Sequence, residues 1–148
     1  MHTRMAQLMG EGVALNPVVG DVLAALRERG VPMYVTTNTP HVLADPCIAG
    51  IGAHYFVDIL SGEDVAQAKP APDMYVEAAR RAGAAPRDCL VFEDSWTGMS
   101  AAAAAGCAVL GLAETVPEGV LKFDPTDFVG AKADDIADWF ARAHAMVG

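Results

Sequence analysis

One stretch indicates the fold of this 148-residue chain: Val91-Phe92-Glu93-Asp94-Ser95-Trp96-Thr97-Gly98-Met99-Ser100, which five alanines and Gly106 follow. The apolar residues 89–92 before the acids predict a buried strand, and the Ala-rich run after them predicts a helix. Two acids at the end of a parallel strand lie where open α/β sheets bind ligands, and two oxygen donors suit Mg²⁺ better than a transition metal. The alternative is a Glu-Asp pair that only opens the helix, favoured by the helix dipole.

Two segments upstream also place polar residues at the predicted boundary of a strand or a helix. Residues 34–40, Tyr-Val-Thr-Thr-Asn-Thr-Pro, form a short strand that ends in hydroxyl residues, and residues 68–73, Ala-Lys-Pro-Ala-Pro-Asp, place Lys69 in a proline-rich turn before a helix. Each segment has a plain structural explanation as well. The threonines could be strand-end and N-cap residues, and Lys69 could be a solvated loop lysine.

The order of a strand-end hydroxyl, a lysine and paired acids resembles motifs two, three and four of the haloacid dehalogenase (HAD)-like hydrolase superfamily. The resemblance is closest to the branch of β-phosphoglucomutase and phosphoglycolate phosphatase, and it covers roughly residues 16–112. It implies that Thr37 and the backbone N–H of Asn38 bind phosphate, and that Lys69 neutralises the nucleophile and the transferred phosphoryl group. Asp94 would be the direct Mg²⁺ ligand, with Glu93 in the inner or outer coordination shell.

The resemblance also implies an α/β fold, a Rossmann-like three-layer α/β/α parallel sheet, but an incomplete one. The family's first motif, an Asp-x-Asp segment that supplies the nucleophile at the end of the central first strand, does not occur in the sequence. We therefore expect residues 1–15 to be a remnant of the cap and its linker, either a short helix or a frayed arm, and residues 16–148 to be a partial core domain. The central first strand should be missing, and Mg²⁺ binding by this chain alone should be weak or absent.

Without a central strand, the backbone N–H and C=O groups on the facing edges of its two neighbours lose their partners. Each group that finds no other partner costs ~1–3 kcal/mol in desolvation. Residues 33–37 and 89–93 could pair directly. A homodimer or a complementing chain could supply a strand to the open edges, or the chain could be a fragment of a longer protein.

Three functions are consistent with this interpretation. The first is the C-terminal part of a HAD-like phosphatase or phosphomutase that acts on a small phosphorylated metabolite and is nearly inactive without its nucleophile. The second is a non-catalytic protein on the same scaffold that binds phosphate or a partner. The third is 2-haloacid dehalogenation, which also requires the missing aspartate. Substrate identity is not predicted, because the cap that would select the substrate is not recognised in the sequence.

Composition narrows the choice of partners. Apolar residues make up 53% of the chain and charged residues 20%, which is typical of a globular domain. A net charge of -9 argues against nucleic acid or an anionic membrane as a partner. The three cysteines show no CxxC spacing, and there is no signal-peptide core, so we expect a soluble cytoplasmic protein.

Alternating helices and strands are expected along the rest of the chain. The pattern predicts strands near 33–35, 54–58 and 107–112, and a helix near 40–49 that is interrupted at Asp45-Pro46. Further helices are expected over 17–29, 72–82 and 134–146, and a turn-rich segment over 114–130. The four histidines show no metal-ligand spacing, and Trp96 and Met99 are expected to serve helix packing rather than substrate contacts.

Overall fold

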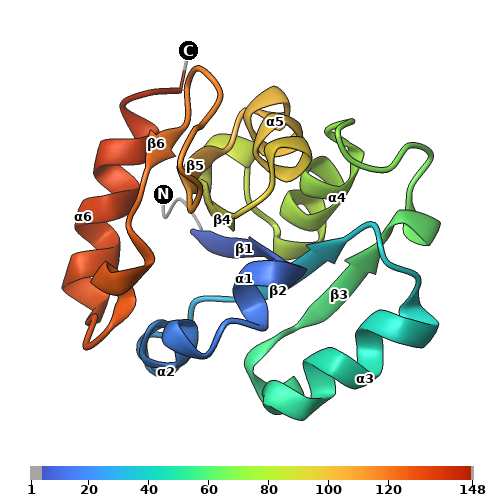
Figure 1. Cartoon of the computed structure of the whole chain (residues 1–148), viewed down its shortest axis with the longest axis horizontal. Helices are drawn as coiled ribbons and strands as arrows, with labels where there is room; N and C mark the ends of the chain where they lie inside the picture. The colour runs from blue at the N-terminus through green and yellow to red at the C-terminus, as the bar shows by residue number, and fades with distance from the viewer. Residues whose placement is uncertain (1–4, 148) are drawn as a thin grey trace.

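A six-stranded parallel sheet forms the centre of the computed structural model, which describes residues 5–147 (Figure 1). The strand order is β3-β2-β1-β4-β5-β6. The strands are β1 (Ala6–Gly10), β2 (Met33–Thr37), β3 (Asp58–Ser61), β4 (Cys89–Glu93), β5 (Ala108–Gly111) and β6 (Leu121–Lys122). The parallel α/β fold predicted from the sequence is confirmed.

The central strand is present, so the prediction that it is missing is wrong. Ala6–Gly10 forms β1, which lies between β2 and β4 with all five residues buried. Gln7 is opposite Met33 on one side and Leu90 on the other. The backbone groups of β2 and β4 that would lack partners without a central strand are paired with β1. Neither direct pairing of β2 with β4 nor a strand from a second chain is needed to complete the sheet.

The strand β1 is hard to predict from the sequence, because a glutamine and a glycine stand among its three apolar residues and give the segment a weak strand propensity. Gln7 is fully buried, and its Nε2 donates to the Leu90 carbonyl oxygen at 2.8 Å, whereas its Oε1 has no hydrogen-bond partner. Residues 6–10 are therefore neither a short helix nor a frayed arm. Residues 1–4 of the expected cap remnant lie outside the described part of the chain, and the origin of the segment as a cap stays a prediction.

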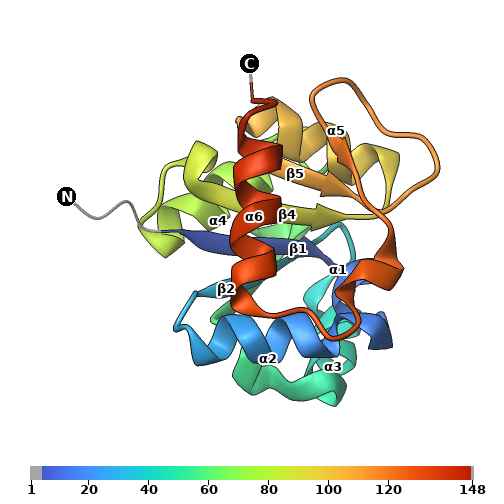
Figure 2. The ribbon, with the colours of Figure 1, turned by 90° about the vertical axis from the view of Figure 1, so that its left-hand side faces the viewer.

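Helices cover both faces of the sheet and complete the three layers (Figure 2). One face packs against α2 (Gly20–Glu28) and α6 (Ala133–His144), and the opposite face packs against α4 (Asp73–Ala82) and α5 (Trp96–Ala105). Alternation along each strand divides the core between the faces. In β1, for example, Leu8 packs on the α4 and α5 side and Met9 on the α2 and α6 side.

The helix boundaries follow local sequence signals. The N-cap of α5 is Ser95, whose hydroxyl accepts a hydrogen bond from the Gly98 N–H at 3.1 Å, and Gly106 ends the helix with φ +89°. A further helix, α3 (His41–Gly52), follows β2. The other elements are short: the helix α1 (Glu11–Ala14), and five 3₁₀ segments, η1 (Pro17–Val19), η2 (Ala53–Tyr55), η3 (Gly62–Asp64), η4 (Pro86–Asp88) and η5 (Pro125–Phe128).

Two local predictions are wrong. The predicted break in the helix after β2 does not occur, because α3 (His41–Gly52) continues through Pro46. Val42, whose carbonyl loses its helical N–H partner to this proline, is 78% exposed, so water can replace the missing donor. The strand predicted at 54–58 lies later, at Asp58–Ser61. The segment 114–130 is turn-rich, as predicted, and it contains the two residues of β6.

Candidate active site

The carboxyl ends of the three middle strands meet at one cavity of about 190 Å³. Since a water molecule takes up about 30 Å³, the cavity has room for an anion of the size of phosphate. All five residues predicted as site residues line it. Its lining consists of Glu11, Gly12, Thr36, Thr37, Asn38, Lys69, Glu93, Asp94, Ser95 and Thr97.

Lys69 and Glu93 form a buried ion pair at the base of this cavity. The Lys69 Nζ donates to Glu93 Oε2 at 2.6 Å and to the Thr36 carbonyl oxygen at 3.1 Å, and the two charged side chains are 7% and 2% exposed. Lys69 is thus no solvated loop lysine. Its ammonium group is held at the end of β2, and its peptide bond to Pro70 is cis.

Tyr75 on α4 is a third member of this buried group. Its hydroxyl donates to the same Glu93 Oε2 at 2.6 Å, and the Lys69 Nζ lies 5.1 Å from the centre of its ring. Burial, followed by the negative charge of Glu93, raises the pKa of Tyr75 well above its usual range, so the hydroxyl stays protonated and acts as a donor. The side chain is fully buried.

Glycines allow the Glu93 carboxylate to lie in this position. A Cβ atom at Gly98 would be 2.1 Å from the Glu93 carboxyl carbon, and one at Gly10 would be 2.6 Å from its Oε1. Glu93 Oε1 accepts hydrogen bonds from the Asp94 N–H at 3.1 Å and from the Ser95 hydroxyl at 3.5 Å. Both oxygens of Glu93 are therefore engaged by protein donors.

Asp94 is the second predicted acid, and its environment differs from that of Glu93. The residue is exposed and lines the cavity. Desolvation of its carboxyl group, and next the nearby charge of Glu93, raise the pKa of Asp94. Within residues 5–147, no group of three or more His, Cys, Asp or Glu residues is arranged to hold a metal ion.

Thr37 and Asn38 shape the opposite wall. The Thr37 Oγ1 accepts a hydrogen bond from the Thr39 N–H at 2.9 Å, which leaves its hydroxyl proton available for a ligand. The Asn38 side chain bridges to the lysine loop: its Nδ2 donates to the Lys69 carbonyl oxygen at 3.1 Å and its Oδ1 accepts from the Lys69 N–H at 3.0 Å. The side chain of Asn38 therefore fixes the loop that carries Lys69.

Two residues of this region were missed in the sequence. Glu11 follows the unrecognised strand β1, and Tyr75 lies within the helix that was predicted over 72–82. The acid after residues 6–10 is the one signal that could have indicated Glu11. Nothing in the sequence around Tyr75 indicates its contact with Glu93.

Other expectations for single residues had mixed outcomes. Cys89 and Cys107 are buried, as expected for small apolar residues, and Cys47 is exposed. Met99 is fully buried, whereas Trp96 is 56% exposed. No helix within residues 5–147 has the length and apolar character needed to cross a bilayer.

His41, at the start of α3, forms an exposed ionic cluster near the site. Its Nδ1 lies 2.8 Å from Asp45 Oδ1 and its Nε2 lies 2.6 Å from Asp64 Oδ2. The hydrogen bond to Asp45, followed by the one to Asp64, raises the pKa of His41 to about 9. The imidazolium therefore connects α3 to the segment after β3 at neutral pH.

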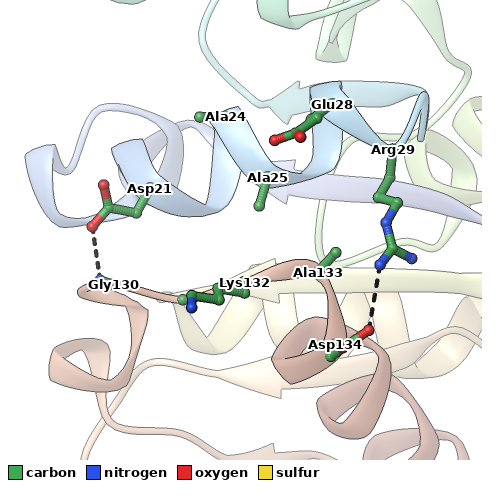
Figure 3. Close-up of a pocket in the computed structure, with 10 residues that line it drawn as sticks. Asp21, Ala24, Ala25, Glu28, Arg29, Gly130, Lys132, Ala133 and Asp134 are labelled. Carbon is green, nitrogen blue, oxygen red and sulfur yellow. Dashed lines mark hydrogen bonds and ion pairs between the residues drawn. The ribbon is translucent and has the colours of Figure 1, made fainter.

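A larger hollow of about 580 Å³ lies between α2 and the start of α6 (Figure 3). Two pairs of its polar groups interact: Asp21 accepts from the Gly130 N–H at 2.7 Å, and Arg29 lies 3.4 Å from Asp134. None of the predicted site residues lines it. The smaller cavity at the strand ends is therefore the candidate active site.

A parallel sheet with a lysine, a hydroxyl and carboxylates at the carboxyl ends of its middle strands defines an α/β protein with a site suited to phosphoryl groups. Residues 4–106 match the haloacid dehalogenase-like hydrolase family, and the chain belongs to that family. Its relatives place it in the branch that contains phosphoglycolate phosphatases and β-phosphoglucomutases.

Two curated relatives illustrate this placement. The phosphoglycolate phosphatase of Escherichia coli (strain K12) is 40% identical over 103 residues, which is 69% of this chain and 41% of that protein. Protein CbbY of Rhodobacter capsulatus is 30% identical over 141 residues, which is 92% of this chain and 57% of that protein. The chain thus spans about half the length of these relatives.

Solved structures agree with the fold. A predicted phosphoglycolate phosphatase from Haemophilus somnus 129PT superposes with a TM-score of 0.64 at 29% identity, covering 75% of this chain and 54% of that chain. The core domain of a phosphoglycolate phosphatase-like protein from Streptococcus pneumoniae TIGR4 gives a TM-score of 0.70 at 20% identity, covering 95% and 97%. The latter likeness concerns the fold alone.

Proposed function

We propose that this chain carries the phosphate-binding and magnesium-binding part of a phosphohydrolase site that acts on a small phosphorylated metabolite. The observation that supports the proposal is the convergence of Thr37, Lys69 and Asp94 on one cavity, from three separate segments of the chain. Fixed donors in a partly buried site stabilise the charge that develops on a phosphoryl group during transfer.

Each residue has a distinct role in this proposal. The Thr37 hydroxyl and the Asn38 N–H would donate to phosphoryl oxygens, and Lys69 would offset their charge. Glu93 would position the ammonium group of Lys69 rather than contact the ligand, since both of its carboxylate oxygens already accept hydrogen bonds from protein donors.

Asp94 would hold Mg²⁺ together with water and the phosphoryl group of the substrate. One or two protein carboxylates are enough for Mg²⁺ when substrate phosphate completes its coordination, and the exposed oxygen donors of Asp94 fit that requirement. Bound there, Mg²⁺ would polarise the phosphoryl oxygens. Binding by this chain alone should be weak, because no group of three ligands is found within residues 5–147.

No aspartate stands at the end of β1, where Gly10, Glu11 and Gly12 follow one another. We therefore expect turnover by this chain alone to be very slow. A second candidate function is a protein that binds phosphate without turnover. It is favoured by the complete central strand, because the sheet is intact although the nucleophile is missing. Dehalogenation would need the same nucleophile and has no separate support.

The test is calorimetric titration of inorganic phosphate into the chain with and without Mg²⁺, together with turnover of an aryl phosphate. We expect Mg²⁺-dependent phosphate binding that is lost in Lys69→Ala and Asp94→Ala. Matched controls are Lys132→Ala and Asp138→Ala, which remove the same charges at exposed positions away from the cavity. Binding with turnover supports the phosphohydrolase, and binding without turnover supports the second candidate. An absence of binding in the unmodified chain would refute both.

A further inference from the structure

Glu11 is an acid of the cavity that the proposed roles leave unexplained. It follows the central strand directly and lines the cavity together with Thr37 and Lys69. Its Oε1 accepts only a long hydrogen bond, 3.4 Å, from the Thr39 hydroxyl, and its Oε2 is buried without a partner. A carboxylate with so few donors is unfavourable unless a ligand supplies a hydrogen-bond donor to it.

The protein offers little to compensate this carboxylate. Lys69 is the one cation that lines the cavity within the described chain, and its Nζ already donates to Glu93 Oε2 and the Thr36 carbonyl oxygen. The cavity thus combines one ammonium group with three carboxylates, those of Glu11, Glu93 and Asp94. An oxyanion that enters it gains from the lysine and hydroxyl donors but meets an acceptor at Glu11.

The position of Glu11 decides which ligand group meets it. Thr39, its hydrogen-bond partner, follows closely on the end of β2, where the Thr37 hydroxyl and the Asn38 N–H are also presented. Glu11 therefore lies beside the proposed donors to the oxyanion, whereas Asp94 follows a different strand, β4, and its carboxylate lies against Gly12. A carboxylate beside an oxyanion is favourable when the oxyanion brings an O–H group, because that proton can be shared between them.

We propose that Glu11 is a specificity residue that accepts a hydrogen bond from a protonated tetrahedral oxyanion and thereby selects phosphate over sulfate. The inference rests on the proposed function of the cavity. Inorganic phosphate keeps at least one O–H group at neutral pH, whereas sulfate has none and would set an oxygen lone pair against the carboxylate. A phosphate monoester has this O–H group only in its monoanion, which forms as the pH falls through about 6, so esters should bind more tightly below that pH.

The test compares inorganic phosphate with sulfate by calorimetric titration of the full chain at neutral pH in the presence of Mg²⁺. We expect phosphate to bind roughly tenfold or more tightly than sulfate, because one hydrogen bond to a charged group distinguishes the two ligands. Glu11→Gln should narrow this ratio to within about threefold, because its amide can donate to sulfate. Glu118→Gln, which removes the same charge at an exposed position, should keep the ratio of the unmodified chain.

Three results would overturn the inference. Equal affinities for the two anions in the unmodified chain, or an unchanged ratio in Glu11→Gln, would exclude Glu11 as the selecting group and leave the phosphate-binding proposal intact. Binding of neither anion would refute both proposals together. Equal unfolding midpoints for Glu11→Gln and the unmodified chain would show that the near-isosteric substitution leaves the fold unchanged.

Discussion

Replacing Leu8 by alanine tests whether residues 6–10 form the centre of the sheet. The Leu8 side chain is fully buried on the side of α4 and α5, and its residue lies opposite Tyr34 in β2 and Val91 in β4. Removing a leucine side chain from such a position costs about 2–5 kcal/mol. A loss of about 3 kcal/mol would lower the melting temperature of a chain of this size by roughly 6–12 °C.

The assay is urea unfolding followed by circular dichroism and by tryptophan fluorescence. Trp139 reports on the core, since it is 8% exposed and its ring lies 4.7 Å from that of Phe123. Leu43→Ala is the control, because Leu43 is 61% exposed on α3 and its loss should change stability by no more than about 0.5 kcal/mol. If Leu8→Ala were no more destabilising than Leu43→Ala, the placement of β1 in the sheet would be wrong.

Four further substitutions test other parts of the structure by urea unfolding. Gly98→Ala should destabilise the fold by about 1–3 kcal/mol, because its Cβ would lie 2.1 Å from the Glu93 carboxyl carbon. Gly20→Ala should instead stabilise it by about 0.5–1 kcal/mol, because a Cβ atom at that position would have no other atom within 4 Å. Tyr75→Phe should cost about 1–3 kcal/mol, since it removes a buried donor to a charged oxygen, and an unchanged stability would contradict that hydrogen bond. His41→Asn should lower stability by less than about 1 kcal/mol, because the cluster is partly exposed. The folded-state pKa of His41 is raised from 6.5 to about 9. The difference in unfolding free energy between the unmodified chain and His41→Asn should therefore be largest below pH 6.5 and disappear as the pH rises through 9. A difference that does not change with pH would exclude the ionic contribution of His41.

The sequence was sufficient where function and local structure impose the same residues. The acids at 93–94 terminate a buried strand, Lys69 lies in a rigid proline-rich turn, and Thr37 ends a short apolar strand. Each signal indicates both an element boundary and a polar group at that boundary. The parallel order of the strands then brings these boundaries to one edge of the sheet, as the cavity confirms.

The sequence was insufficient where tertiary contacts decide the outcome. Residues 6–10 have weak strand propensity, and they form β1 because both neighbouring strands supply hydrogen-bond partners. The different environments of Glu93 and Asp94 depend on Tyr75, which contacts Glu93 from 18 residues away in the chain. Such long-range contacts leave no periodicity in the sequence.

The position of β1 also bears on how the chain folds during synthesis. The Gln7 side chain contacts the Leu90 carbonyl oxygen, a partner 83 residues later in the chain. At about 5–20 residues per second, a ribosome needs roughly 4–17 s to produce that partner after β1 has been made. During that interval β1 can pair only with β2, and its other edge stays open to chaperones or to neighbouring nascent chains. The central strand of the finished sheet is therefore, for several seconds, an edge strand.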